Sequence, residues 1–270
     1  DALQINIAEN GAVKSTFCHS CGQYTAASDG YSPVEIPEPS EPKPKPDFSS
    51  VERMLTTANY QAIVSRGLNT ATAKTYGILE KPDKTYFSYH DPEDANVPIA
   101  AKIRLPDKNF YNVGNWSGAG LFGQQLFNGG GKYITLCEGE FDAAAAYQMQ
   151  GSKYACVSVR NGAGGALKDC KAAYEYLDSF EAIIICFDAD EAGCKASKEV
   201  AELFSGKAAI VKHTGGHKDA CDYLVANDIK GFTAAFWAAE KFVPDGIING
   251  ASLWDEVNRP VEKSAVMYPW

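Results

Sequence analysis

The chain has 270 residues, of which 45% are hydrophobic and 22% charged, and its formal net charge is −9 at pH 7. This length is enough for one large domain or two modest ones. The acidic balance argues against a protein that coats duplex nucleic acid, because such proteins are usually basic. The acidic net charge is still compatible with a local strip of basic residues on the surface. No apolar run approaches the roughly 18 residues that a membrane-spanning helix needs.

The first part of the chain divides into a short segment with a cysteine pair and a proline-rich linker. Cys18 and Cys21 lie in residues 1–29, and residues 30–48 carry repeated prolines among charged residues. Two cysteines at this spacing supply half of the ligands of a zinc ribbon, and no second Cys-x-x-Cys follows. The composition of residues 30–48 predicts a semi-extended linker.

The six remaining cysteines are scattered through helix-like and strand-like segments: Cys137, Cys156, Cys170, Cys186, Cys194 and Cys221. This distribution is typical of small buried hydrophobic side chains in a reduced compartment.

Residues 49–130 predict a small α+β subdomain. Helical patterns cover about 51–55 and 59–66, and a third helix begins near residue 69. Strand-like runs follow at 85–89, 97–104 and 109–113, separated by Asp-Pro and Pro-Asp turns. Such turns favour an antiparallel meander.

Residues 131–245 alternate between strands and helices. The expected strands are 133–137, 154–159, 182–187 and 208–212, and the expected helices are 142–149, 166–176 and 192–204. This alternation predicts a parallel sheet flanked by helices, which binds ligands beyond the carboxyl ends of its strands. Residues 246–270 contain a helix capping box at Ser252 and predict a connector. The ends at Asp1 and Trp270 suggest a fragment of a longer polypeptide.

Two of these strands run directly into clusters of acids. The first is followed by Glu138-Gly139-Glu140-Phe141-Asp142, and the second by Asp188-Ala189-Asp190. Carboxylates at one sheet edge repel one another and cost free energy to desolvate. Paired hard oxygen ligands suit Mg²⁺ or Mn²⁺, completed by water and substrate phosphates. The alternative is that the acids only complement helix N-termini, which explains one or two of them but not both clusters.

Three glycine-rich segments were considered as phosphate-binding motifs. Residues 118–123 spell GxGxxG, but no strand precedes them, so dinucleotide binding is not expected. Residues 129–132 lack the spacing of a P-loop. Residues 161–165 follow a strand and precede a helix, and there a phosphate cradle and a plain tight turn are equal alternatives.

The ordered set of motifs resembles the Toprim primases, and within them the primase half of the primase-helicases of T-odd phages, relatives of mitochondrial Twinkle. The motifs are Cys18-x-x-Cys21, Arg66-Gly67-Leu68, Lys102-x-Arg104, Lys108-Asn109-Phe110, Leu121-Phe122-Gly123, the two acidic clusters, Lys218-Asp219-Ala220 and Val243-Pro244-Asp245-Gly246. The resemblance covers nearly the whole chain. It implies an α/β fold: a Toprim parallel sheet flanked by helices, preceded by a small α+β subdomain and a truncated zinc-ribbon remnant.

The resemblance also implies roles for the matched acids. Glu138 resembles the Toprim glutamate, a metal ligand or general base, and Asp188 and Asp190 resemble the Asp-x-Asp metal ligands, which makes these three the expected catalytic residues. Further metal or substrate ligands are expected at Glu140, Asp142 and Asp219.

The matched basic residues resemble those that bind nucleotide and template. Lys102 and Lys108 resemble lysines that contact the phosphates of the incoming nucleotide, and Arg104 lies on the same strand face as Lys102. The alternative for all three is a solvated sheet face. In the family, the second cysteine pair lies upstream, so residues 1–29 would be the end of a zinc-binding domain, with Zn²⁺ present in the intact protein.

The function implied is template-directed synthesis of short RNA primers from ribonucleoside triphosphates on single-stranded DNA, with Mg²⁺ or Mn²⁺, by two-metal nucleotidyl transfer. The implied partners are the helicase domain of the same polypeptide, hexameric in the full-length protein, and a replicative DNA polymerase. No membrane is implied, and the location would be the cytoplasm of a phage host rather than a mitochondrion.

Two other functions stay open. One is a non-catalytic module that binds single-stranded DNA and feeds a helicase. The other is a different Toprim enzyme, a nuclease or a topoisomerase, although a topoisomerase needs a nucleophilic Tyr in a separate gate domain and no region is left to form one.

Overall fold

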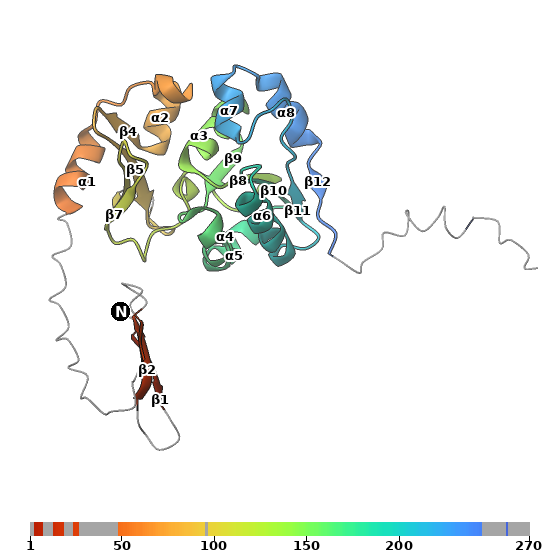
Figure 1. The fold of residues 1–270 in the computed structure, drawn as a ribbon. Helices are drawn as coiled ribbons and strands as arrows, with labels where there is room; N and C mark the ends of the chain where they lie inside the picture. Colours follow the sequence, from red (N-terminus) through yellow and green to blue (C-terminus); the bar gives the residue numbers. More distant parts are fainter. Residues whose placement is uncertain are drawn as a thin grey trace, which may run out of the picture. The chain divides into compact units, whose positions relative to one another are not determined.

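The computed structural model describes residues 3–7, 13–18, 24–26, 48–94, 97–244 and 258. The chain forms two compact units, Asp1–Pro44 and Lys45–Trp270. The described part of the first unit is an antiparallel sheet of β1 (Leu3–Ile7), β2 (Val13–Cys18) and β3 (Tyr24–Ala26) (Figure 1). Cys18 ends β2, but Cys21, the linker up to Asp47 and the connector helix near Ser252 lie outside the described residues. The zinc-ribbon remnant therefore stays a prediction.

The second unit begins with helices and an antiparallel sheet. Its elements are α1 (Phe48–Thr57), the 3-10 helix η1 (Val64–Arg66), α2 (Thr70–Tyr76), β4 (Ile78–Lys81), β5 (Lys84–His90), β6 (Pro98–Arg104) and β7 (Phe110–Gly114). The strands pair in the order β4-β5-β6-β7, which confirms the meander and adds β4. The expected helix over 59–66 is wrong: Ile63 and Leu68 exchange backbone hydrogen bonds of 2.9 and 3.2 Å, which closes the chain into a tight turn around η1.

The rest of the second unit is the half that the resemblance assigns to a Toprim sheet. Its elements are η2 (Gln124–Leu126), β8 (Tyr133–Cys137), α3 (Glu140–Met149), β9 (Ala155–Ser158), α4 (Gly162–Ala172), α5 (Tyr174–Asp178), β10 (Ala182–Cys186), α6 (Glu191–Leu203), β11 (Ala208–Ile210), α7 (Ala220–Val225), α8 (Ile229–Trp237) and β12 (Glu240–Lys241). The sheet order is β12-β11-β10-β8-β9, and every pair is parallel except β11 with β12.

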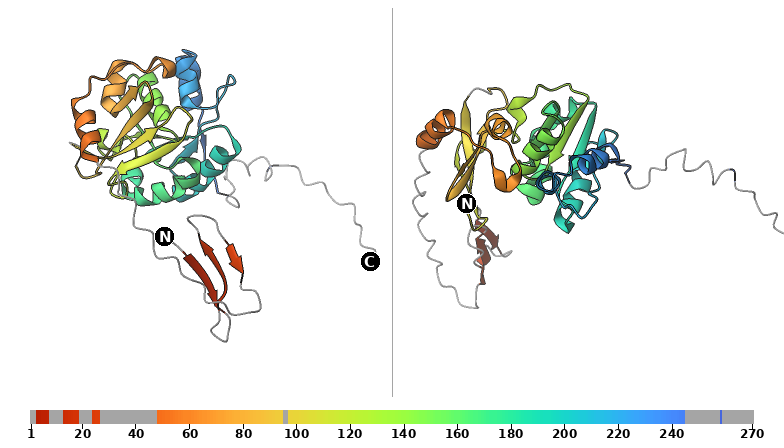
Figure 2. Two further views of the ribbon diagram at one scale, coloured as in Figure 1. Left: turned by 60° about the vertical axis from the view of Figure 1, so that its left-hand side comes forward. Right: turned by 90° about the horizontal axis from the view of Figure 1, so that it is seen from above.

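Helices cover both faces of this sheet, as the continuous apolar run of β10 predicted. Ile183 and Ile185 pack with α4 and α6, whereas Ile184 and Cys186 face the layer of α3, α7 and α8. Helix α3 lies between the two sheets of the unit (Figures 1 and 2). Its residues 143–146 are fully buried alanines, whose small side chains let both sheets approach the helix.

Several local expectations need correction. The single helix expected over 166–176 is two helices, α4 and α5, and α4 begins at Gly162. Helices α7 and α8 and strand β12 were not predicted. Cys194 is exposed, unlike the other five cysteines of residues 131–245. No described helix is long and apolar enough to cross a membrane.

Candidate active site

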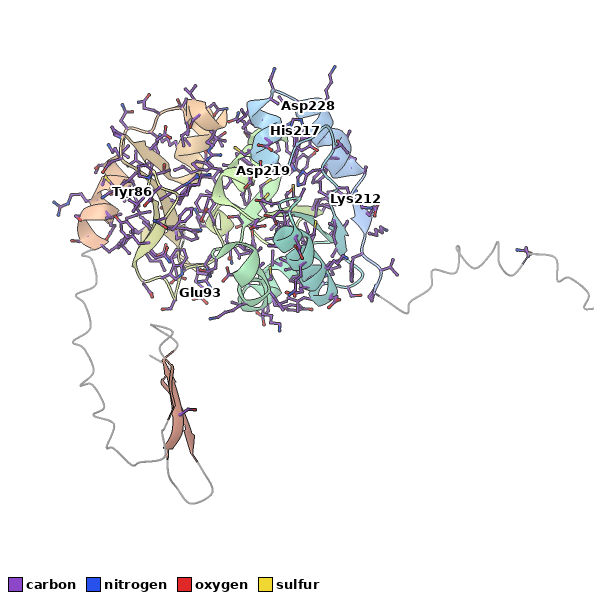
Figure 3. The ribbon with its side chains drawn as sticks, viewed as in Figure 1. Tyr86, Glu93, Lys212, His217, Asp219 and Asp228 are labelled. Atoms are coloured by element: carbon purple, nitrogen blue, oxygen red, sulfur yellow. The ribbon has the colours of Figure 1, made fainter. Side chains whose placement is uncertain are left out.

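The two acidic clusters follow strand ends that lie side by side at one edge of the sheet. Cys137 at the end of β8 pairs with Cys186 at the end of β10, so Glu138 and Asp188 follow at one carboxyl edge. Asp219 reaches this edge from the start of α7 (Figure 3). The structure therefore brings together carboxylates that lie far apart in the sequence.

Glu138 is held by the loop after β9. The backbone N–H of Ala163 donates to its Oε1 at 3.1 Å, while its Oε2 is buried and has no hydrogen-bond partner. Burial raises the pKa of Glu138, and the N–H groups of Ala163 and Asp188 oppose this. Residues 161–165, which the sequence offered as a phosphate cradle or a tight turn, form the start of α4, and the N–H of Ala163 there binds a carboxylate of the protein itself.

Asp188 and Asp142 are each partly or fully buried among other carboxylates. Burial, together with the carboxylates of Glu138, Asp219 and Asp190, raises the pKa of Asp188 from 3.8 to about 7. Burial, Asp219 and Asp188 raise the pKa of Asp142 well above its usual value, although Asp142 accepts a 3.0 Å hydrogen bond from a backbone N–H. Five of the six predicted acids therefore form one electrostatic cluster.

The helix-end alternative is true in part. Asp190 caps α6 and accepts a 2.7 Å hydrogen bond from the Gly193 N–H, and Asp219 caps α7 with a 2.7 Å bond from the Asp222 N–H. Each cap uses one carboxylate oxygen. Glu138 and Asp142 also accept hydrogen bonds from N–H groups in the first turns of α4 and α7, so helix ends account for part of their environment. They do not account for the meeting of both acidic clusters at one sheet edge.

Two glycines leave the space that these acids occupy. A Cβ on Gly193 would lie 2.2 Å from the carbonyl oxygen of Asp188, and a Cβ on Gly139 would lie 2.5 Å from Oδ2 of Asp142. Any side chain at either position would displace the acid. Steric crowding therefore explains why glycine occupies the positions after Glu138 and Asp190 in the two motifs.

Glu140 has a different environment from the other acids. Its side chain is 6% exposed, and its Oε1 accepts hydrogen bonds from Lys102 Nζ at 2.7 Å and from the Tyr89 hydroxyl at 2.6 Å. Lys102 also donates to the carbonyl oxygen of Arg160 at 3.0 Å. The structure thus joins a predicted metal ligand and a predicted nucleotide-binding residue in one buried ion pair, and both assignments stay predictions.

The five clustered acids fit a hard divalent cation. Their donors are oxygens, one oxygen of Glu138 is buried without a partner, and mutual repulsion raises the pKa of Asp188. Within the described residues, no three His, Cys, Asp or Glu side chains are already placed to hold one metal ion between them. Mg²⁺ usually keeps several waters and completes its ligands with substrate phosphates, so this arrangement suits it.

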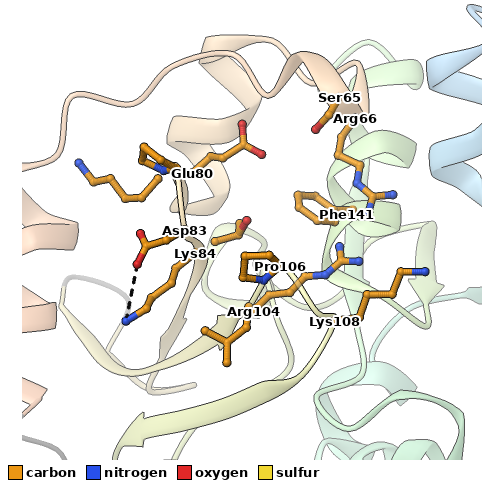
Figure 4. Close-up of a pocket in the computed structure, with 13 residues that line it drawn as sticks. Ser65, Arg66, Glu80, Asp83, Lys84, Arg104, Pro106, Lys108 and Phe141 are labelled. Carbon is orange, nitrogen blue, oxygen red and sulfur yellow. Dashed lines mark ion pairs between the residues drawn. The ribbon is translucent and has the colours of Figure 1, made fainter.

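A hollow of about 240 Å³ is lined by more basic than acidic side chains (Figure 4). Its charged lining residues are Arg66, Lys81, Lys84, Arg104, Lys108, Glu80 and Asp83, and Phe141 reaches it from the first turn of α3. The guanidinium carbons of Arg66 and Arg104 lie 4.8 and 5.7 Å from the centre of the Phe141 ring. Lys108 has a φ of 67°, uncommon for a residue with a side chain.

The two arginines of the hollow lack acidic partners. Among the ion pairs of the described residues, none contains Arg66 or Arg104. Burial and the neighbouring charge of Arg66 lower the pKa of Arg104. Glu140 also attracts Arg104, but neither guanidinium group forms an ion pair among the described residues, so the two are a favourable site for a phosphate. Sequence reasoning assigned no role to Arg66, although the motif Arg66-Gly67-Leu68 marked its position.

Comparison with known proteins gives consistent matches. A family model described as Toprim-like matches residues 135–224. The DNA helicase/primase of Enterobacteria phage T3 is 37% identical over 205 residues, which are 75% of this chain and 36% of that protein. The chain therefore spans about a third of that relative's length.

Comparison with solved structures also identifies phage primases. The crystal structure of the primase fragment of the bacteriophage T7 primase-helicase protein matches with 31% identity and a TM-score of 0.60, covering 87% of this chain and all of that one. A structure of bacteriophage T7 lagging-strand DNA polymerase with primase domains bound to an RNA/DNA hybrid and dTTP gives 36% identity and a TM-score of 0.60, covering 68% of this chain and 93% of the matched one. These findings confirm the resemblance and the α/β Toprim fold. The chain belongs to the Toprim primases, in the branch formed by the primase halves of T-odd-phage primase-helicases.

Proposed function

We propose that this chain synthesises short RNA primers on single-stranded DNA as the primase part of a primase-helicase. The observation that carries the proposal is the position of α3. Its first turn places Phe141 against the unpaired arginines, while Asp142 and the preceding Glu138 belong to the acidic cluster. A nucleoside triphosphate needs both a cation site and positive side chains for its phosphates.

The acids would hold divalent cations. Glu138, Asp188 and Asp190 are the proposed catalytic ligands, and Asp142 and Asp219 are proposed further ligands. When bound, Mg²⁺ or Mn²⁺, two ions in the expected mechanism, would supply a lower pKa for the attacking 3′-hydroxyl and positive charge for the phosphates. Glu138 is the acid with an unpartnered oxygen, and the N–H of Ala163 fixes its direction toward the cluster.

The basic residues would hold the triphosphate and the template backbone. Arg66, Arg104 and Lys108 offer charged donors around one hollow. Lys102 is oriented by Glu140 and by the carbonyl oxygen of Arg160, so its position is set before substrate binds. Preorganised positive charge stabilises phosphoryl-transfer transition states without a reorganisation cost.

The remaining elements of the proposal concern the intact protein. The T3 relative is named a helicase/primase, and a T7 neighbour was solved with a DNA polymerase and an RNA/DNA hybrid. We infer a helicase domain in the same polypeptide, hexameric when complete, a polymerase that receives the primer, Zn²⁺ in the complete N-terminal domain, and the cytoplasm of a phage host as the location.

The direct experiment is primer synthesis by the purified chain. Ribonucleoside triphosphates, single-stranded template and Mg²⁺ should give short RNA products that are lost when Mg²⁺ is chelated. DNA binding without incorporation at any Mg²⁺ or Mn²⁺ concentration would instead identify a non-catalytic module. Nicking of plasmid DNA would identify a nuclease or topoisomerase.

Arg66→Ala should weaken the binding of single-stranded DNA or nucleotide about tenfold. A charge-assisted hydrogen bond contributes about 1.5–3 kcal/mol, and each 1.4 kcal/mol is a factor of ten. The dissociation constant, measured by fluorescence anisotropy at several salt concentrations, should also depend less on salt. Arg53→Ala removes the same charge from an exposed position of α1 and should have little effect. Equal losses in both variants would point to net charge rather than to the hollow.

Mg²⁺ should stabilise the protein more at high pH than at low pH. The folded-state pKa of Asp188 is raised from 3.8 to about 7, so its contribution to stability is full at low pH and is lost as the pH rises through about 7. Metal binding requires the ionised carboxylate and removes the repulsion. Thermal unfolding with and without millimolar MgCl₂ should show the larger shift at about pH 8 and a smaller one at about pH 5. The same shift at both values would contradict the metal site.

A further inference from the structure

A buried ion pair lies behind the loop that joins β9 to α4. Nε and Nη2 of Arg160 donate to Oδ1 of Asp169 at 3.2 and 3.0 Å. The Asp169 side chain is fully buried and that of Arg160 is 13% exposed. Nine residues separate the two in the sequence, and nothing in the motifs marks them as partners.

Both members of this pair have further hydrogen bonds. Nη1 of Arg160 donates to the carbonyl oxygens of Trp116 and Ala119 at 3.1 and 2.7 Å. Oδ2 of Asp169 accepts from the backbone N–H groups of Arg160 and Asn161 at 2.8 and 3.1 Å. The pair therefore fastens the loop after β9 to helix α4 and to the segment that follows β7. A buried charge pair with its hydrogen bonds satisfied specifies one geometry.

The loop fixed in this way contacts both parts of the candidate site. The carbonyl oxygen of Arg160 accepts a hydrogen bond from Lys102 Nζ at 3.0 Å. Three residues later, the N–H of Ala163 donates to Glu138 Oε1 at 3.1 Å. Gly162, between them, has a φ of 61°, and a Cβ there would lie 3.6 Å from that same oxygen. The loop and the adjoining first turn of α4 thus orient a proposed nucleotide-binding lysine and a proposed metal ligand, respectively.

We propose that the Arg160–Asp169 pair is a positioning pair for nucleotidyl transfer, setting the places of Glu138 and Lys102 through the loop between β9 and α4 and the first turn of α4. This inference rests on the proposed function. Groups that orient metal ligands in this way typically change metal affinity by 10- to 100-fold when they are removed.

The test compares Arg160→Gln, Arg160→Lys and the wild type. Gln keeps a hydrogen-bond donor but loses the charge. Asp169 still accepts hydrogen bonds from the backbone N–H groups of residues 160 and 161, so we expect the variant to fold. Lys keeps the charge but cannot donate to Asp169 and to both carbonyls at once. Mn²⁺ binding is measured by direct titration without nucleotide, and KM and kcat are measured in primer synthesis.

Arg160→Gln should raise the Mn²⁺ dissociation constant on the order of tenfold and raise the KM for ribonucleotides, with Arg160→Lys between it and the wild type. The matched control is Asp178→Asn, which breaks the 2.9 Å ion pair with Lys207 that precedes β11. That variant should change the midpoint of thermal unfolding only.

The other outcomes distinguish a failure of the positioning role from a failure of the proposed function. A folded Arg160→Gln variant with a lower unfolding midpoint but unchanged Mn²⁺ affinity and KM would overturn the positioning role and leave the proposed function intact. Absence of Mn²⁺ binding by the wild type would overturn the proposed function and the positioning role with it. If Arg160→Gln does not fold, Arg160→Lys decides: wild-type Mn²⁺ affinity and KM would overturn the role, and intermediate values support it.

Discussion

Asp188→Asn should abolish primer synthesis and at the same time stabilise the metal-free protein. Loss of a metal ligand removes several kcal/mol of transition-state stabilisation, and about 4 kcal/mol corresponds to a thousandfold loss of rate. Asn cannot ionise, so the repulsion that raises the pKa of Asp188 to about 7 disappears. Because Asp188 is only partly buried, solvent screening reduces this gain, and at about pH 8 the free energy of unfolding should rise by on the order of 2 kcal/mol.

These opposite signs separate a functional acid from a structural one. Primer synthesis and urea unfolding of the metal-free protein measure the two effects, and added Mg²⁺ should stabilise the variant less than the wild type. Asp228→Asn is the matched control, because Asp228 caps α8 through a 2.9 Å bond from the Gly231 N–H and lies outside the cluster. It should leave both measurements near wild type. Undiminished synthesis by Asp188→Asn would contradict the proposed mechanism.

The positions of the acids could be predicted because they follow from local pattern. Apolar runs ending at Cys137 and Phe187 predicted buried parallel strands, and parallel strands present their carboxyl ends at one edge. Glu138 and Asp188 then had to meet, as the register shows. The helix over 59–66 failed because a pair of backbone hydrogen bonds between Ile63 and Leu68 outweighed the helical pattern.

The partners of the charged residues could not be predicted, because they depend on packing between distant segments. Lys102 and Glu140 are 38 residues apart and meet only because α3 lies against the antiparallel sheet. Arg66 gains its role from the Phe141 ring, which belongs to another element. The sequence shows which residue types the site contains. Which of them become hydrogen-bond or ion-pair partners is decided where the antiparallel sheet packs against α3.

Lys102→Met should lower the free energy of unfolding by about 3–5 kcal/mol, the usual cost of removing one member of a buried ion pair. Glu140 would keep only the hydroxyl of Tyr89 as a side-chain partner, at 2.6 Å, for a charge that is nearly excluded from water. The double variant Lys102→Met/Glu140→Gln should recover most of this loss, because no charge is then left buried without a partner. Urea unfolding of the two variants measures the difference.

The double variant also separates stability from nucleotide binding. If Lys102 contacts the phosphates, the KM for ribonucleotides should remain high after stability has recovered, since the positive charge is still missing. Recovery of both quantities would instead make Lys102 a structural residue that neutralises Glu140. Phosphate binding would then rest with Arg66, Arg104 and Lys108, three of the basic side chains that line the hollow with Phe141. The predicted role of Lys102 thus depends on whether an ammonium group that is already paired with Glu140 can also bind a substrate phosphate. The KM of the double variant, measured once its stability has recovered, distinguishes the two roles.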